Sequence, residues 1–252
     1  MIKVYLQFHN SLNDFLPPEK RNIEFSYAFK QQRSIKDLIE SVGIPHTEID
    51  LIIINSVSVT FNYQVINGEH IKVYPADAGT GNLTRSSNFI HLQPEPIHPV
   101  KFILDVHLGK LARNLRMLGF DSLYQNTYKD AELAEISANE NRILLSCDVK
   151  LLMRNNVIYG YFVRSRDPRQ QLLEIISRFD LSNTLKPFSR CMQCNAEIHA
   201  LDKQDIESQL LEDTRKYYND FYQCSACSKI YWKGSHYRNM QQEIERIIAD
   251  QR

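Results

Sequence analysis

The chain lacks any long apolar run, and its longest apolar stretches are strand-length segments such as Leu51–Ile54. A membrane-spanning helix needs about 20 predominantly apolar residues, so the sequence predicts no transmembrane segment. No signal peptide precedes the alternating pattern at the start of the chain, and we expect a cytoplasmic protein. Net charge is also absent, because 30 Lys and Arg residues balance 30 Asp and Glu residues. Only residues 100–186 are slightly basic, which by itself does not predict nucleic-acid binding.

Cysteine is scarce, yet four of the five cysteines form two pairs with identical spacing. Two residues separate Cys191 from Cys194, and two separate Cys224 from Cys227. Two such knuckles complete a tetrahedral thiolate site with no open position, so we predict a structural zinc ion. The alternatives are two disulfides, a redox motif or a rubredoxin-like iron centre. A matched pair of motifs in a polar C-terminal region favours zinc.

Residues 1–76 predict a small α+β unit of the ubiquitin-like β-grasp type. Alternating strands flank one helix, which starts at Ser34 with Asp37 three residues later and stops at Gly43. Residues 77–99 are predicted to be a linker, and we expect deletion of residues 1–95 to leave the remainder folded. The unit is expected to bind a protein partner through an exposed strand. A sulfur-carrier function is disfavoured, because the linker glycines are neither adjacent nor C-terminal: Gly79 and Gly81.

From Lys101 the pattern changes to alternating strands and helices, which predicts an α/β domain with a parallel sheet over residues 100–186. Residues 187–252 then hold the cysteine pairs and a final helix. Three acids stand at or just beyond predicted strand ends, where parallel sheets place functional groups: Asp105, Asp130 and Asp148. Carboxylates converging from separate loops suit Mg²⁺ or Mn²⁺. The alternative is that Asp130 and Asp148 only cap helices.

Basic and aromatic residues give weaker predictions. The helix predicted at residues 108–118 repeats a cation every third residue, and another cation follows the last strand, which would suit phosphates: Lys110, Arg113, Arg116 and Arg164. The alternative is a solvated surface. The run 231–236 mixes aromatics with cations, and it either stacks on bases or supports the ribbon. Cys147 is predicted to be a buried thiol at a strand end rather than a nucleophile.

Four segments together resemble the Mut-seven C-terminal RNase family, which has a PIN-like nuclease fold with an appended zinc ribbon. They are residues 105–120, 142–148, 188–195 and 231–236. The resemblance implies metal-dependent RNA cleavage with Asp105, Asp130 and Asp148 at the acidic positions. It also implies that the N-terminal unit is the ubiquitin-like domain fused to this module in bacterial members. His107 replaces an expected Met, and Ser146-Cys147 replaces Thr-Arg; the candidates for a fourth acid are Asp167 and Glu132.

The sequence therefore predicts a metal-dependent ribonuclease with a structural zinc ribbon, Mg²⁺ or Mn²⁺ at the acids, and RNA as substrate. The alternative is a non-catalytic RNA- or ribosome-associated binding module that uses the same basic surface. Loss of metal-dependent cleavage on Asp105→Asn would separate the two.

Overall fold

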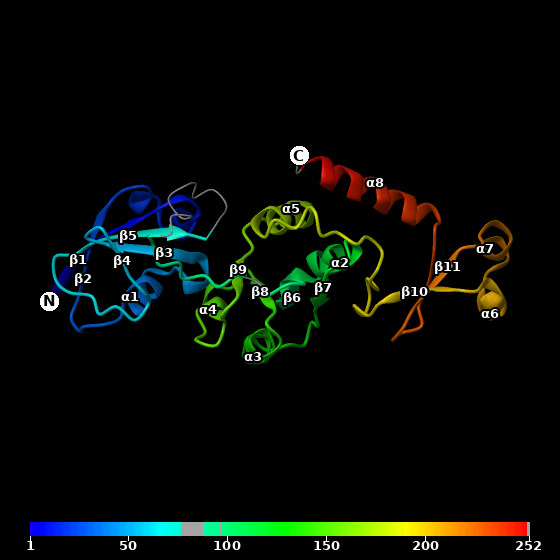
Figure 1. The fold of residues 1–252 in the computed structure, drawn as a ribbon, viewed down its shortest axis with the longest axis horizontal. Coiled ribbons are helices and arrows are strands. Elements are labelled where there is room, and N and C mark those ends of the chain that lie inside the picture. The colour runs from blue at the N-terminus through cyan, green and yellow to red at the C-terminus, as the bar shows by residue number, and fades with distance from the viewer. Residues whose placement is uncertain (77–87, 96, 251–252) are drawn as a thin grey trace. The chain divides into compact units, whose positions relative to one another are not determined.

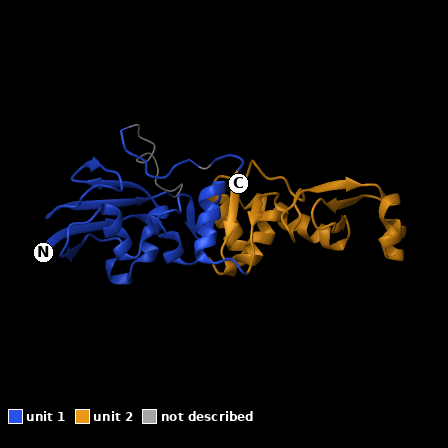
Figure 2. Ribbon diagram, turned by 90° about the horizontal axis from the view of Figure 1, so that it is seen from below, with its two compact units in different colours: residues 1–99, 127–163 blue, residues 100–126, 164–252 orange. Residues whose placement is uncertain are grey.

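The structure is a computed structural model, and it describes residues 1–76, 88–95 and 97–250. The chain divides into two compact units, which are coloured separately in Figure 2. Unit 1 contains residues 1–99 and 127–163, and unit 2 contains residues 100–126 and 164–252. The linker glycines named above, Gly79 and Gly81, lie outside the described residues.

A five-stranded sheet forms the N-terminal part of unit 1, with the order β2-β1-β5-β3-β4 (Figure 1). Strands β1 and β5 at its centre run parallel, and the remaining neighbours are antiparallel. This arrangement confirms the predicted β-grasp fold. The strands are β1 (Ile2–Phe8), β2 (Phe25–Phe29), β3 (Ile49–Ile54), β4 (Val57–Ser58) and β5 (His70–Pro75).

Helix α1 (Ile35–Val42) begins and ends at the residues that the sequence predicts. The hydroxyl of Ser34 accepts a hydrogen bond from the Asp37 N–H at 3.1 Å, as an N-cap does, and it donates to the Asp37 carboxylate at 2.7 Å. Gly43 ends the helix with a φ of 103°, which a side chain would disfavour. The buried face of α1 packs into the core beneath the sheet, and this burial holds the helix in place.

The second part of unit 1 is an α/β segment. It contains α3 (Asp130–Glu140), β8 (Ile143–Ser146), α4 (Val149–Leu152) and β9 (Gly160–Phe162). Strands β8 and β9 are parallel, and all four residues of β8 are buried, as the apolar sequence predicts.

Residues 157–162 contact the β-grasp sequence through the 3-10 helix His46–Glu48, whose three residues are all buried. The Glu48 carboxylate accepts a hydrogen bond from the Phe162 N–H at 2.7 Å, and His46 Nε2 lies 2.9 Å from the Val157 carbonyl oxygen. A Cβ atom at Gly160 would lie 3.0 Å from Thr47 Cγ2, so the two segments approach closely. The compact units therefore follow packing rather than the domain limits predicted from composition, and those limits stay a prediction.

Unit 2 contains a second parallel pair, β6 (Lys101–Leu104) and β7 (Asp121–Leu123), with α2 (Gly109–Met117) between them and α5 (Pro168–Arg178) later in the chain. The apolar side of α2 is fully buried through Leu111, Ala112 and Leu115. Gly119 follows the helix with a φ of 93°, and a Cβ atom there would lie 2.2 Å from a backbone oxygen. The chain therefore turns from α2 into β7 only because this residue is glycine.

The C-terminal part of unit 2 is a three-stranded antiparallel ribbon in the order β10-β11-β12. Its strands are β10 (Ile198–Leu201), β11 (Phe221–Cys224) and β12 (Ile230–Trp232). Two short helices, α6 (Lys203–Ile206) and α7 (Glu212–Tyr217), lie between β10 and β11, which explains the long spacing between the cysteine pairs. The chain ends in α8 (Ser235–Ala249). Among the described residues, none of the helices has the length and apolar character needed to cross a bilayer.

Candidate metal centre and acidic site

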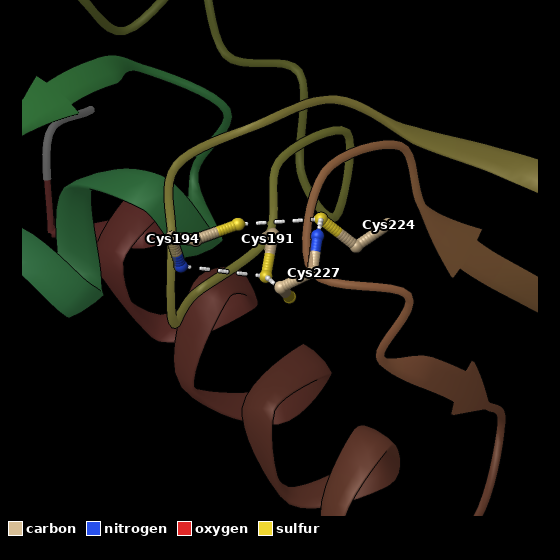
Figure 3. Close-up of side chains that lie close together, drawn as sticks. All are labelled: Cys191, Cys194, Cys224 and Cys227. Atoms are coloured by element: carbon tan, nitrogen blue, oxygen red, sulfur yellow. Dashed lines mark hydrogen bonds between the residues drawn. The ribbon is translucent and has the colours of Figure 1, made fainter.

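The four paired cysteines converge on one point. The sulfur atoms of Cys191, Cys194, Cys224 and Cys227 all lie within 4.8 Å of one another (Figure 3). Two sulfur–sulfur contacts cross between the knuckles, with 3.3 Å from Cys194 to Cys224 and 3.6 Å from Cys191 to Cys227. Four thiolates around a common centre form a closed donor set of the kind that zinc takes in structural sites.

Both knuckles have the same backbone turn. In each, the N–H of the second cysteine points to the first sulfur over 3.5 Å. The residue that follows each pair has a positive φ, 74° at Asn195 and 56° at Ser228, and its N–H donates to the carbonyl of the first cysteine. This repeated geometry aims two sulfurs and their N–H donors at one side, which is what a cation held by thiolates requires.

Tyr231 lies against the cluster, with its hydroxyl 3.0 Å from Cys191 Sγ. Burial acts to raise the pKa of Cys191, but hydrogen bonds from Tyr231 and from the backbone N–H groups of Cys194 and Gln193 bring it down to about 6. Partial burial and the neighbouring thiols raise the pKa of Cys194 to about 12. One thiolate therefore forms readily while a neighbour resists ionisation, and a cation bound at the centre would favour the thiolate form of all four cysteines.

Arg116 fastens the first knuckle to α2 and β7. Its side chain is only 5% exposed, and its guanidinium donates to the carbonyl oxygens of Ser122 at 2.8 Å and Gln193 at 2.9 Å. A third, longer contact of 3.4 Å reaches the Met192 carbonyl. These partners are backbone groups inside unit 2, so the guanidinium faces the interior of that unit rather than a substrate surface.

Asn195 makes a second connection between the ribbon and β7. Its side-chain oxygen accepts a hydrogen bond from the Ser122 N–H at 2.9 Å, and its amide nitrogen donates to the Asp121 carboxylate at 2.8 Å. The side chain thus pairs with the strand much as another strand would, and it is 6% exposed. Arg116 and Asn195 together build the four-cysteine centre into the sheet region of unit 2.

Asp105 lies in unit 2 at the end of β6, where the sequence places it. The residue is 6% exposed, and its carboxylate accepts a hydrogen bond from the Val106 N–H at 2.6 Å. It thereby caps the 3-10 helix Val106–Leu108 that leads into α2. A largely buried carboxylate directly after a parallel strand is suitably placed to bind a cation, and the backbone bond orients it.

Asp130 and Asp148 lie in unit 1, and both are exposed. Asp148 follows β8 and caps α4, since its carboxylate accepts from the Lys150 N–H at 2.7 Å. Its own N–H donates to Ser146 Oγ at 2.8 Å, so the turn is held on both sides. Asp130 is the first residue of α3, whose N-cap is Lys129. Among the described residues, the four cysteines of unit 2 are the one group of three or more close side chains that could bind a metal. The three-acid site therefore stays a prediction.

The predicted basic residues differ in their surroundings. Lys110 and Arg113 are exposed on α2, where they line a hollow together with Met192 and Met240. Arg164 follows β9 and is half-buried, and its N–H donates to the Glu174 carboxylate at 2.9 Å. The exposure of Lys110 and Arg113 suits phosphate binding, which stays a prediction for all three.

Two residues near Asp105 were not singled out from the sequence. The hydroxyl of Tyr124 donates to the Val106 carbonyl at 2.9 Å, and a Cβ atom at Gly109 would lie 2.8 Å from that hydroxyl. Glycine at the start of α2 therefore lets Tyr124 hold the turn that follows Asp105. The glycine itself is the only sequence signal for this contact.

The predicted burial of Cys147 is wrong, because the residue is exposed. It does follow the last residue of β8, as predicted, and its thiol contacts the Val163 carbonyl at 3.4 Å.

Fold and site together define an α/β protein that carries a β-grasp domain and a four-cysteine centre. The chain belongs to the Mut7-C RNAse domain family, whose family model matches residues 100–244. A second family model, described as Mut7-C ubiquitin, matches residues 1–80. No curated protein and no solved structure matches the chain. The matches confirm the predicted family and its N-terminal domain, and they support a nuclease as the coarse class of function.

Proposed function

We propose that the chain is a cytoplasmic ribonuclease that hydrolyses RNA phosphodiester bonds with Mg²⁺ or Mn²⁺ held by Asp105, Asp130 and Asp148. A zinc ion at the four cysteines has a structural role. The single observation that carries the proposal is the family match over residues 100–244, since it covers all three acids. A protein partner would pair with β2 or β4, the edge strands of the β-grasp sheet.

The local geometry of the acids supports the proposal. Asp105 and Asp148 each follow the last residue of a parallel strand by one or two positions, and each carboxylate is oriented by one backbone N–H. Carboxylate oxygens are the ligands that hard divalent cations prefer. A divalent ion held by these carboxylates would polarise the phosphate and lower the pKa of an attacking water. The side chains themselves provide negative charge and position, so a nucleophilic side chain is not needed.

The experiment uses Asp→Asn substitutions, because asparagine caps a helix about as well as aspartate. Asp105→Asn and Asp148→Asn should keep the fold and abolish cleavage of single-stranded RNA with Mn²⁺. Asp202→Asn is the matched control, since Asp202 also caps a short helix, α6, through its carboxylate, but lies in the ribbon insertion. Equal cleavage by all variants, or cleavage that persists in EDTA while zinc is retained, would refute the proposal.

A non-catalytic RNA-binding module is the second candidate. The observation that favours it is that Asp105 and Asp148 both serve as caps, so structure alone accounts for their presence. This candidate predicts RNA binding without cleavage in wild type. It also predicts that Asp105→Asn changes nothing except a slight gain in RNA affinity from the lost negative charge.

A further inference from the structure

The ribbon carries an aromatic hollow of about 290 Å³ that the predicted active site does not use. Five aromatic rings line it, contributed by the loop before the first knuckle, by β11 and β12, and by the first turns of α8: Phe188, Tyr222, Tyr231, Trp232 and Tyr237. The volume is near the lower end of small-ligand sites, so the hollow suits one or two flat rings rather than a helix.

The rings are held in place. Tyr231 is anchored by its hydroxyl contact to Cys191, and the rings of Phe188 and Tyr237 lie 4.5 Å apart. Trp232 is 38% exposed, and a Cβ atom at Gly234 would lie 2.9 Å from its indole nitrogen. Glycine at position 234 therefore leaves room for the indole, whose remaining surface is open to a ligand. Preformed, partly exposed aromatic faces are what base stacking requires.

The charged side chains that line the hollow are cationic. They are Arg190 and Lys233, and the described lining contains no acidic side chain, although Arg190 also lies 3.8 Å from the Asp121 carboxylate behind it. A neighbouring hollow of about 390 Å³ shares Met192 and Met240 with it and adds Lys110 and Arg113, again without an acid in the described lining. An apolar polypeptide segment would use the aromatic rings but not the cations. A polyanion that carries flat rings would use both the rings and the cations, and single-stranded nucleic acid has that chemistry.

We propose that this hollow is a base-stacking site for single-stranded RNA, with a base against Trp232 and the adjoining phosphates at Lys233, Lys110 and Arg113. This inference rests on the proposed function for its choice of RNA, and it adds a substrate-holding site on the ribbon. The site binds without strong sequence preference, because every base has a face to stack.

The test uses intrinsic fluorescence, because Trp232 is the single tryptophan of the chain. The full-length, zinc-loaded protein is titrated with a 12-nucleotide single-stranded RNA without added Mg²⁺ or Mn²⁺, and anisotropy of a labelled copy follows binding independently. We expect saturable quenching of the tryptophan emission with the same midpoint as the anisotropy change, and little quenching by a duplex of the same sequence. RNA binding with unchanged emission would overturn the proposal and indicate another occupant, such as a polypeptide.

Substitutions separate stacking from structure. Trp232→Leu should lower the RNA affinity about tenfold or more, and Trp232→Phe should restore most of it. Tyr217→Leu is the matched control, since Tyr217 is a 67% exposed aromatic beside Lys216 in the same unit but outside the hollow. Lys233→Gln, an exposed substitution with little effect on folding, should reduce the slope of log affinity against log salt by about one. Each variant is checked for zinc content.

The outcomes distinguish this proposal from the proposed function. Quenching and tenfold loss on Trp232→Leu without any cleavage by wild type would refute the nuclease proposal and support the stacking site. Metal-dependent cleavage together with equal RNA affinity for Trp232→Leu and Tyr217→Leu would support the nuclease and overturn the stacking site.

Discussion

Replacing Arg116 by methionine tests whether the four-cysteine centre is built into unit 2. Methionine has a similar length and fits a buried position, but it has no hydrogen-bond donor. The substitution removes the bonds to the Ser122 and Gln193 carbonyls, at 2.8 and 2.9 Å, inside a site where the side chain is 5% exposed. Burial lowers the pKa of Arg116, whereas nearby thiols and Asp121 raise it, so the guanidinium sits between unfavourable desolvation and favourable charges.

The magnitude follows from the two short bonds. Leaving the buried Ser122 carbonyl without a partner costs about 1–3 kcal/mol. The part-buried bond to Gln193 adds about 0.5–1.5 kcal/mol, and the contact at 3.4 Å to Met192 adds little. Avoiding the desolvation of a buried charge offsets part of this loss, so we expect Arg116→Met to lower the free energy of unfolding by about 1–4 kcal/mol. Because the lost bond to Gln193 positions the first knuckle, zinc affinity should also fall about 10- to 100-fold.

The assay is urea unfolding of the zinc-loaded chain, followed by the emission of Trp232, which lies in the ribbon. Zinc affinity is measured by competition with a chromogenic chelator. Arg113→Met is the matched control, since Arg113 lies three residues earlier on α2 and is exposed. Surface substitutions usually change stability by less than about 0.5 kcal/mol. Equal losses of stability and zinc affinity in the two variants would refute the role of Arg116 in connecting the first knuckle to unit 2. A stable Arg116→Met protein with unchanged zinc affinity would refute it too.

Three further predictions concern other parts of the chain. Gly109→Ala places a methyl group 2.8 Å from the Tyr124 hydroxyl, so the turn after Asp105 should shift and RNA cleavage should fall about tenfold or more in a folded protein. Wild-type rates would contradict this. Deletion of residues 1–95 should leave a chain that still folds but unfolds at lower urea concentration, because the buried Glu48 contact is lost and its backbone partner is orphaned. Equal urea midpoints for the truncated and the full-length chain would contradict this prediction. Elemental analysis should find about one zinc per chain, and chelation should raise hydrogen exchange in residues 187–234 before the β-grasp sheet responds. Unchanged exchange in the ribbon after zinc removal would contradict a structural metal.

Local signals in the sequence predict the elements whose formation is local. Ser34, Asp37 and Gly43 specify both ends of α1 through short-range hydrogen bonds and one left-handed residue, and the structure reproduces them. The cysteine spacing likewise predicts the convergence of four sulfurs, because each knuckle is a local turn. Only the approach of the two knuckles to each other is non-local, and the identical spacing of the two cysteine pairs predicts that they share one site.

The burial of Arg116 shows where spacing misleads. Residues three apart on a helix are about 300° apart in rotation, so each step of three drifts by about 60°. Lys110 and Arg116 are therefore about 120° apart around α2, and the third cation of the repeat turns toward the buried side. The structure has Lys110 and Arg113 exposed and Arg116 buried, in keeping with that drift. The charge of a residue alone predicts exposure, so a buried arginine is assigned to the surface until its carbonyl partners are known.

The contact between residues 46–48 and 157–162 has no local signal at all. His46 and Glu48 are polar residues beside Pro45, which favours a surface turn, yet both are buried against backbone groups far along the chain. A linker predicted from Gly, Ser and Pro content says where a chain is unlikely to form strands or helices. It does not determine whether the segments on either side pack together, because packing depends on partners that are distant in sequence.

The position of the four-cysteine centre explains how a metal outside the predicted active site can still matter for activity. Arg116 lies in α2 and donates a hydrogen bond to Gln193 in the first knuckle, and α2 begins four residues after Asp105. The same helix presents Lys110 and Arg113 beside the aromatic hollow of the ribbon. Loss of the cation would remove the bonds that join the two cysteine pairs. The first knuckle would then loosen, and with it both the helix that follows the predicted catalytic acid and the surface proposed to hold RNA. A closed metal site with no chemistry of its own would then affect cleavage through position alone, and its removal should impair RNA binding and catalysis together rather than either one separately.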